Sequence, residues 1–264
     1  MITLSDLHLT FNPGTALANS VLSGFNLTIP TGQFVTVIGS NGAGKSTVLN
    51  LISGDLQPDR GEVSIGDLKV TPWDTARRAK LVARVFQNPL AGSCTHLTLE
   101  ENLALAAQRG TPRTLRPAPP HAFRQHCKPR LAELNLGLEN RLDDRIGLFS
   151  GGQRQAVSLL MCTLAPTQVL LLDEHTAALD PKNADTILHL TNQIVRDRAL
   201  TTLMVTHSMK QALQWGDRTL MLHGGKIILD LVGEARSGVT VQDLLDQFEQ
   251  RSGDALTDDS LLLG

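Results

Sequence analysis

The chain has 264 residues, of which 41% are hydrophobic and 19% are charged, which is enough for one large core or for a core with an additional lobe. Its formal net charge of −2 argues against the broad basic surface of a nucleic-acid-binding protein, so we expect no nucleic acid partner. Three scattered cysteines, Cys94, Cys127 and Cys162, predict reduced thiols rather than a disulfide framework.

The N-terminal part of the chain is typical of antiparallel β structure. Residues 1–35 and 61–70 contain short strand-like runs joined by turns such as NPGT and PTG. The opening stretch MITLSDLHLT alternates apolar and polar residues, which predicts an edge strand. It also lacks the charged and apolar regions of a signal peptide.

A glycine-rich loop then lies between a buried strand, predicted over residues 34–38, and a helix that begins near Lys45. Its spacing is G-x-x-x-x-G-K-S, in which glycines let backbone N–H groups turn toward a phosphate and the helix directs its positive end at the same anion. Lys45 can reach the β- and γ-phosphates and the Ser46 hydroxyl can bind Mg²⁺. A plain turn is the alternative, but the flanking strand and helix favour a nucleoside triphosphate site formed by Gly39, Ser40, Asn41, Gly42, Ala43, Gly44, Lys45, Ser46 and Thr47.

The strand pattern disappears between Gln87 and Met161, which predicts a helical lobe over about residues 88–165. Residues 98–109 have apolar side chains at helical spacing and acids in the first turn. Residues 111–130 hold five prolines and five basic side chains, which predicts an exposed, semi-rigid insertion. Its charge is either a solvated face or a contact with anionic lipid or a partner chain.

Two acids follow the next buried strand, predicted over residues 169–173. Asp173 at its carboxyl end is placed to hold Mg²⁺, directly or through water, and Glu174 can polarise an attacking water. Just before this strand, Ser150, Gly151 and Gly152 at a helix start offer a second anion site or a simple helix cap.

Strand and helix patterns alternate through the rest of the chain. A strand is predicted at TTLMVT and a hairpin over residues 219–231, and residues 253–264 are expected to be a flexible tail. The alternation indicates an α/β fold with a largely parallel sheet and helices on both faces.

The segment LFSGGQRQAVSLLM resembles the L-S-G-G-Q signature of ABC-type ATPases, with Phe149 in place of the usual leucine. The resemblance covers about residues 2–232. It implies a P-loop NTPase ABC ATPase fold: a mostly parallel core, an antiparallel β subdomain and a helical subdomain within one domain over 1–252. It also implies that Ser150, Gly151, Gly152 and Gln153 complete the nucleotide site of a second copy, in a head-to-tail dimer.

Further residues match the family's other motifs in order. Gln87 in VFQNP resembles the glutamine that contacts Mg²⁺ and the attacking water, Asp180 resembles the acid of the dimer seam, and His207 resembles the switch histidine. Phe11 stands where an aromatic ring stacks on adenine, with a core role as the alternative. The resemblance thus makes Lys45, Gln87, Glu174 and His207 the catalytic candidates, and Ser46, Gln87 and Asp173 the metal ligands.

His175 departs from the proline that is common after the catalytic glutamate. An imidazole at that position could titrate near neutral pH and change the pH dependence of turnover. The alternative is a tolerated variant that only changes local backbone freedom.

The resemblance implies an ATP- and Mg²⁺-dependent ATPase subunit of an ABC importer; an exporter or lipoprotein-release subunit is the alternative. No apolar run reaches the about 20 residues of a membrane span, so we expect a peripheral protein on the cytoplasmic face of the membrane. Its expected partners are a second copy, permease subunits and, indirectly, a substrate-binding protein. The runs FNPGT, GSNGAGKST and DEHTAALDPK resemble a subgroup assigned to tryptophan or related aromatic amino acids.

The segment Gln87–Leu97 joins the glutamine to the helical lobe. Pro89 and Gly92 suit a loop that changes conformation, and Leu90 and Leu97 offer apolar contacts. We predict that a short cytoplasmic helix of the permease docks in a groove lined by this segment and the start of the 98–109 helix. The alternative is that the two leucines complete the lobe's own core.

Overall fold

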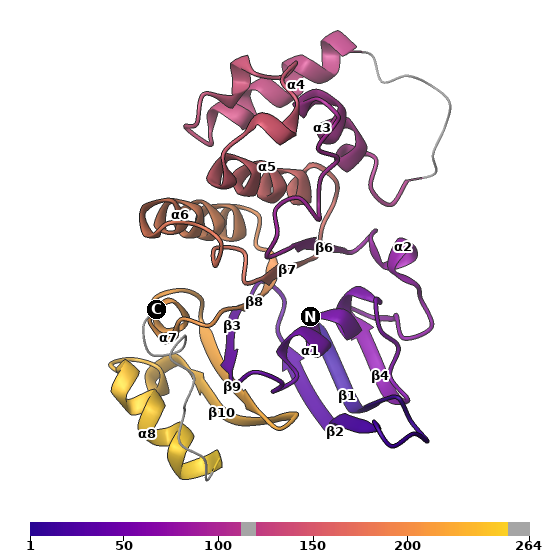
Figure 1. Ribbon diagram of the computed structural model, residues 1–264, viewed down its shortest axis with the longest axis vertical. Helices are drawn as coiled ribbons and strands as arrows, with labels where there is room; N and C mark the ends of the chain where they lie inside the picture. Colours follow the sequence, from indigo (N-terminus) through magenta and orange to yellow (C-terminus); the bar gives the residue numbers. More distant parts are fainter. Residues whose placement is uncertain (112–119, 253–264) are drawn as a thin grey trace.

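The computed structural model describes residues 1–111 and 120–252, and these form two β-sheets flanked by helices (Figure 1). The larger sheet has the strand order β10-β9-β3-β8-β7-β6, with parallel pairing from β6 to β9 and an antiparallel β10 at the edge. All residues of β3 are buried, as expected of a strand covered on both faces. The strands are β3 (Phe34–Gly39), β6 (Val82–Val85), β7 (Val169–Asp173), β8 (Thr201–Val205), β9 (Arg218–His223) and β10 (Lys226–Val232).

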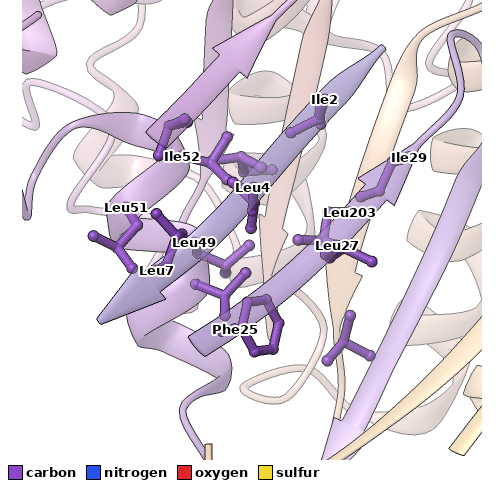
Figure 2. Packing of buried hydrophobic residues seen from close by; sticks show 14 of the residues in the cluster. Ile2, Leu4, Leu7, Phe25, Leu27, Ile29, Leu49, Leu51, Ile52 and Leu203 are labelled. Carbon is purple, nitrogen blue, oxygen red and sulfur yellow. The ribbon is translucent and has the colours of Figure 1, made fainter. Parts of the chain in front are cut away.

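The smaller sheet is antiparallel, with the order β2-β1-β4-β5. Its apolar face packs on α1 (Lys45–Ser53), as Figure 2 shows for Leu4, Phe25 and Leu49. Because β1 lies between β2 and β4, the expectation of an edge strand is wrong. Alternation reports that one face is buried, and this holds for interior and edge strands alike. The strands are β1 (Ile2–Phe11), β2 (Asn19–Ile29), β4 (Arg60–Ile65) and β5 (Leu68–Lys69).

Helices cover both faces of the large sheet, which confirms the predicted α/β arrangement. On one face, α1 packs with alternate residues of β3, β7 and β8, such as Val37, Leu171 and Leu203. On the other face, α5 (Gly151–Leu164) and α6 (Pro181–Asp197) pack on Leu170 and Leu172. Figure 1 shows α1 beside the small sheet and α5 and α6 across the large one. Near β9 and β10 lie α7 (Met209–Gln214) and α8 (Val241–Ser252).

Between β6 and β7 the described residues form helices with a hydrophobic core of their own. They include α3 (Leu99–Ala107), which matches the predicted 98–109 helix and starts with a Thr98–Glu101 capping box. Its apolar face packs on α4 (Pro120–Ala132) and α5. The fold is completed by the small helix α2 (Thr75–Arg78) and by three short 3-10 turns. These turns are η1 (Leu138–Asn140), η2 (Ile146–Leu148) and, after β10, η3 (Gly233–Ala235).

The prediction for 111–130 is corrected in part where the structure describes it: the segment is a helix of the lobe, not a semi-rigid insertion, although Gln125, His126 and Lys128 are exposed. From Pro120 the chain is helical, and Cys127 is buried in the core of the lobe. Arg124 makes ion pairs with Glu100, at 2.6 Å, and with Asp143, so its charge is used within the lobe. The many prolines and basic residues masked the helical pattern, because only a few apolar side chains of this helix, among them Cys127 and Leu131, reach the core of the lobe. Residues 112–119, and the predicted tail over 253–264, lie outside the described residues.

Candidate functional site

The glycine-rich loop leads from the end of β3 into α1. Lys45 is buried at the start of the helix, and its Nζ donates to the carbonyl oxygens of Gly39 at 2.6 Å and Ser40 at 3.0 Å. Gly39 has a φ of 151°, and a Cβ there would lie 2.1 Å from the carbonyl oxygen of Leu222. A side chain at position 39 would therefore displace the loop from β9.

The turn between β9 and β10 supports this loop from outside. The N–H of Gly225 donates to the carbonyl of Ala43 at 3.2 Å, and His223 Nδ1 lies 3.3 Å from Ser40 Oγ. The sequence indicated only a hairpin at this turn, so its contact with the loop was missed. The paired glycines were the available signal, since a Cβ at Gly225 would lie 1.9 Å from the carbonyl oxygen of Val21.

Three of the predicted residues lie at the carboxyl ends of β7 and β8; β8 pairs with β3 in the sheet, and β7 lies on the other side of β8. Asp173 ends β7, and Glu174 follows with a φ of 46° and a backbone N–H bond to Val205 at 3.0 Å. The left-handed backbone of a non-glycine residue is costly and is often retained at functional sites. His207, just after β8, places Nε2 2.6 Å from Glu174 Oε1, while its buried Nδ1 has no hydrogen-bond partner among the described residues.

Oxygen donors suited to Mg²⁺ lie around this edge. The Ser46 hydroxyl is at the exposed start of α1, the Asp173 carboxylate is at the end of β7, and the Gln87 amide is exposed just after β6. Within 1–111 and 120–252 there is no group of three or more His, Cys, Asp or Glu side chains that could hold a metal. Mg²⁺ binds through one or two carboxylates together with substrate phosphates, and the Asp173 carboxylate with the Ser46 hydroxyl and the Gln87 amide fits that requirement.

The SGGQ segment begins α5 and is closed by a capping box. Ser150 Oγ accepts from the N–H of Gln153 at 3.2 Å, and Gln153 Oε1 accepts from the N–H of Ser150 at 3.1 Å. The same segment contacts the loop after β7, because Gly151 faces Leu179. Asp180 in that loop caps α6, and its hydrogen bonds from the backbone and then the side chain of Asn183 hold its pKa below the usual value.

The predicted site residues therefore form two groups in one chain. Lys45, Asp173, Glu174 and His207 belong to neighbouring strand ends, whereas Ser150 begins a helix that covers the opposite face of the sheet from α1. Phe11, at the end of β1, is 37% exposed and lies outside the described hydrophobic clusters, which argues against a core role.

His175 follows Asp173 and Glu174 in the chain, but its side chain points away from them into the interior. Its side chain is buried, and Nε2 lies 3.1 Å from Thr191 Oγ1 of α6. Burial lowers the pKa of His175 to about 4, so the imidazole is neutral at physiological pH. The hypothesis that it titrates near neutral pH is wrong.

One residue of the site was missed by the sequence analysis. Arg84 of β6 donates through Nη2 to Asp173 Oδ2 at 2.6 Å. Arginine inside an apolar strand was the available signal, but its target is more than eighty positions away in the chain and only strand pairing brings the two together.

Comparison with known proteins agrees with this geometry. Residues 22–177, more than half of the chain, match the sequence model of the family described as ABC transporter. A tyrosine transport ATP-binding protein of Clostridioides difficile is 41% identical over 249 residues, which covers 94% of this chain and 99% of that protein. A thiamine import ATP-binding protein of Photobacterium profundum is 33% identical, with coverage of 92% and 99%. An aliphatic sulfonates import ATP-binding protein of Rhodopseudomonas palustris is 34% identical, with coverage of 88% and 74%.

Solved structures give the same result. A dimeric ATP-binding cassette in a post-hydrolysis state, bound to ADP and Pi, has a TM-score of 0.75 and 28% identity, with 88% of this chain and 98% of that chain covered. Another dimeric structure, of a bacterial ABC transporter cassette, has a TM-score of 0.73 at the same identity and coverage. None of the described helices is both long and apolar enough to span a bilayer.

Proposed function

The chain belongs to the ABC transporter family, and we propose that it hydrolyses ATP to energise uptake of tyrosine or a related aromatic amino acid through a separate permease. The likeness to a tyrosine transport protein over nearly the full length of both chains supports this substrate class. Other relatives are named import proteins, which supports the direction; nothing in the comparisons favours the exporter alternative. The chain would act on the cytoplasmic face of the membrane.

The active unit is a head-to-tail dimer with two composite nucleotide sites. The observation that carries this proposal is that the two anion-binding segments lead into helices, α1 and α5, on opposite faces of the large sheet. One chain cannot close its own Gly39–Thr47 loop with its own Ser150–Gln153, so a second copy must supply the latter. The dimeric cassettes among the solved relatives support the same arrangement. Phe11 is open to stack on the adenine, and Asp180 lies next to the signature glycines at the seam.

At each site the side chains bind and position the phosphates rather than react covalently. Lys45 now donates to two carbonyls of its own loop, and these bonds are exchanged for phosphate oxygens when ATP binds. Glu174 accepts a proton from, or orients, the attacking water, and His207 contacts the γ-phosphate. A bound Mg²⁺, held by Ser46, Gln87 and Asp173, would supply charge neutralisation at the phosphates.

The permease docks in a cavity of about 1010 Å³ at the junction of the core and the helical lobe. Phe86, Pro89 and Cys94 line it on one side and Leu105 of α3 on another, close to the groove predicted from the sequence. Helix α2, strand β6, the end of α1 and helix α5 also line it, which the sequence did not indicate. A movement of the lobe relative to the core would thus shift the docked helix.

The Glu174→Gln variant tests the assignment of the general base. The amide keeps the size of the side chain but cannot take a proton, so we expect ATP binding to be retained. Turnover should fall about 100-fold or more, within the range of general-base contributions. The ATP-bound dimer should then accumulate and be visible by size-exclusion chromatography with ATP, while phosphate release measures turnover.

The matched control is Glu133→Gln, which removes an exposed carboxylate in the helical lobe and should leave both measurements unchanged. Turnover by the Glu174→Gln variant at the wild-type rate would refute the assignment of Glu174.

A further inference from the structure

Arg84 joins three elements that carry parts of the nucleotide site. It stands on β6 opposite Leu171 of β7, so its side chain lies on the same face of the sheet as Asp173, the face covered by α1. Its side chain is only 13% exposed. Nη2 donates to Asp173 Oδ2 at 2.6 Å, and Nη1 donates to Asn50 Oδ1 at 2.7 Å and Asp55 Oδ2 at 3.0 Å.

These contacts connect the two ends of the proposed cation site. Asn50 lies near the end of α1 and Asp55 just beyond it, and α1 begins with Lys45 and Ser46. Asp173 ends β7. Arg84 therefore fixes the helix that carries the Ser46 hydroxyl relative to the strand that carries the Asp173 carboxylate.

The charges of this cluster favour a cation rather than repel one. Asp55 and Asp173 share the single guanidinium of Arg84, so the three groups together carry a net charge of −1. The hydrogen bond from Arg84 goes to Asp173 Oδ2, so Oδ1 is the oxygen that can face a cation. Hydrogen bonds of this kind, made to the second oxygen of a ligating carboxylate, orient it and typically change metal affinity by about 10- to 100-fold.

We propose that Arg84 is a positioning residue for the divalent cation, which sets the orientation of Asp173 and its separation from Ser46. The inference rests on the proposed function, since it takes Ser46 and Asp173 as the ligands of the cation that accompanies ATP. Arg84 does not touch the phosphates in this scheme. Its effect is confined to the metal-dependent part of nucleotide binding.

The Arg84→Met variant separates this role from a general contribution to folding. Equilibrium binding of a fluorescent, non-hydrolysable ATP analogue to the isolated chain is measured over a range of Mg²⁺ concentrations and again in the presence of EDTA. We expect the half-saturating Mg²⁺ concentration to rise roughly 10-fold. Binding in EDTA should be unchanged, because Lys45 and the loop amides do not depend on Arg84.

Lys80→Met is the matched control, because Lys80 is exposed and, like Arg84, lines the cavity at the junction of core and lobe, so the variant removes one positive charge nearby. Its Mg²⁺ dependence should equal that of the wild type. Arg84→Lys is the conservative variant and keeps the positive charge. A single ammonium lacks the fork that spans Asp55 and Asp173, so the shift in Mg²⁺ dependence should persist, and this variant decides the matter if Arg84→Met does not fold.

An unchanged or lower half-saturating Mg²⁺ concentration in a folded Arg84 variant would overturn the proposal. A loss of analogue binding that is equal with Mg²⁺ and with EDTA would also overturn it, since it would indicate a purely structural role. If the wild-type chain itself bound the analogue without any dependence on Mg²⁺, the proposed function would be at fault instead.

Discussion

Glu174 and His175 are adjacent in the chain, yet their side chains have opposite environments. Glu174 faces the strand ends and contacts His207 at 2.6 Å. His175 turns into the interior and contacts Thr191 at 3.1 Å. The left-handed backbone at Glu174 accompanies this divergence. His175 is therefore expected to affect stability rather than the chemistry of the site.

We predict that His175→Pro changes the pH dependence of stability but leaves the pH dependence of turnover between about pH 6 and 8 unchanged. The pKa of His175 is about 4 in the folded chain, below the 6.5 of an ordinary histidine. The unfolded chain thus binds the extra proton first, so the stabilisation is present above pH 6.5 and is lost as pH falls toward 4. Between pH 8 and pH 5 the wild type should lose about 2 kcal/mol more than the variant.

Urea unfolding of both proteins at several pH values measures this difference, and titrating groups common to both cancel. Parallel stability curves would show that His175 is not buried as described. Turnover profiles that differ near pH 7 would instead restore the hypothesis that His175 titrates in the working range.

The segment between β6 and α3 is held by side chains of α3 and α5 and by backbone bonds from η2 to Thr95 and Leu97. Asn102 of α3 is buried and bonds Cys94 in both directions, accepting from its N–H at 2.8 Å and donating to its carbonyl at 3.0 Å. Gln155 of α5 donates to the carbonyl of Phe86 at 3.2 Å. Leu90 is exposed, so it does not complete the core of the lobe. Leu97 is half-buried, so of the two leucines only Leu90 is fully open to a docked helix. The segment is bonded to elements of the lobe and is therefore expected to move with it.

We predict that Cys94 crosslinks to one cytoplasmic loop of the permease, with a yield that differs between nucleotide-free and ATP-bound complexes. Cys94 is exposed and lines the cavity, whereas Cys127 and Cys162 are buried, so a thiol-specific reagent reports mainly on Cys94. The measurement uses assembled complexes whose permease carries single cysteines, with Cys94→Ser as the control. Crosslinks from other parts of the lobe but never from Cys94 would show that the docking site is elsewhere.

The helix that follows the Gly39–Thr47 loop and the helix that begins at Ser150–Gln153 cover opposite faces of one sheet. A dimer built from two such chains has two sites, each with one segment from each copy. A substitution in the Gly39–Thr47 loop of one chain and a substitution in Ser150–Gln153 of the other chain then fall in the same site. When one chain carries both substitutions, they fall in different sites.

We predict that a Lys45→Ala chain mixed with a Gly151→Asp chain recovers part of the activity that each lacks alone. In the mixed dimer one site contains both lesions and the other contains neither. Random pairing should give roughly a quarter of wild-type turnover, if the sites act independently in a symmetric dimer. Asp at position 151 adds a carboxylate at the start of α5, where it repels phosphate, and its Cβ lies 3.3 Å from Leu179. Verified heterodimers with no activity at all would contradict independent composite sites.

Local patterns in the chain were enough to predict the strand, loop and helix of residues 34–53, the buried strand 169–173 and the capped helix after Thr98. Each depends on contacts between near neighbours: glycines that permit left-handed backbone, apolar residues at a fixed period, and a polar cap. For the same reason the order of the motifs was sufficient to identify the family. Composition was a weaker guide over 120–130, where prolines and arginines concealed a helix.

Strand pairing and side-chain burial settled what those patterns could not. The place of β1 inside its sheet, the contact of Arg84 with Asp173, and the opposite environments of Glu174 and His175 all depend on residues far apart in the chain. A local pattern records that one face is buried but not which partner buries it, because many distant partners satisfy the same pattern. Only the assembled fold selects one, and with it the charges that surround each functional side chain.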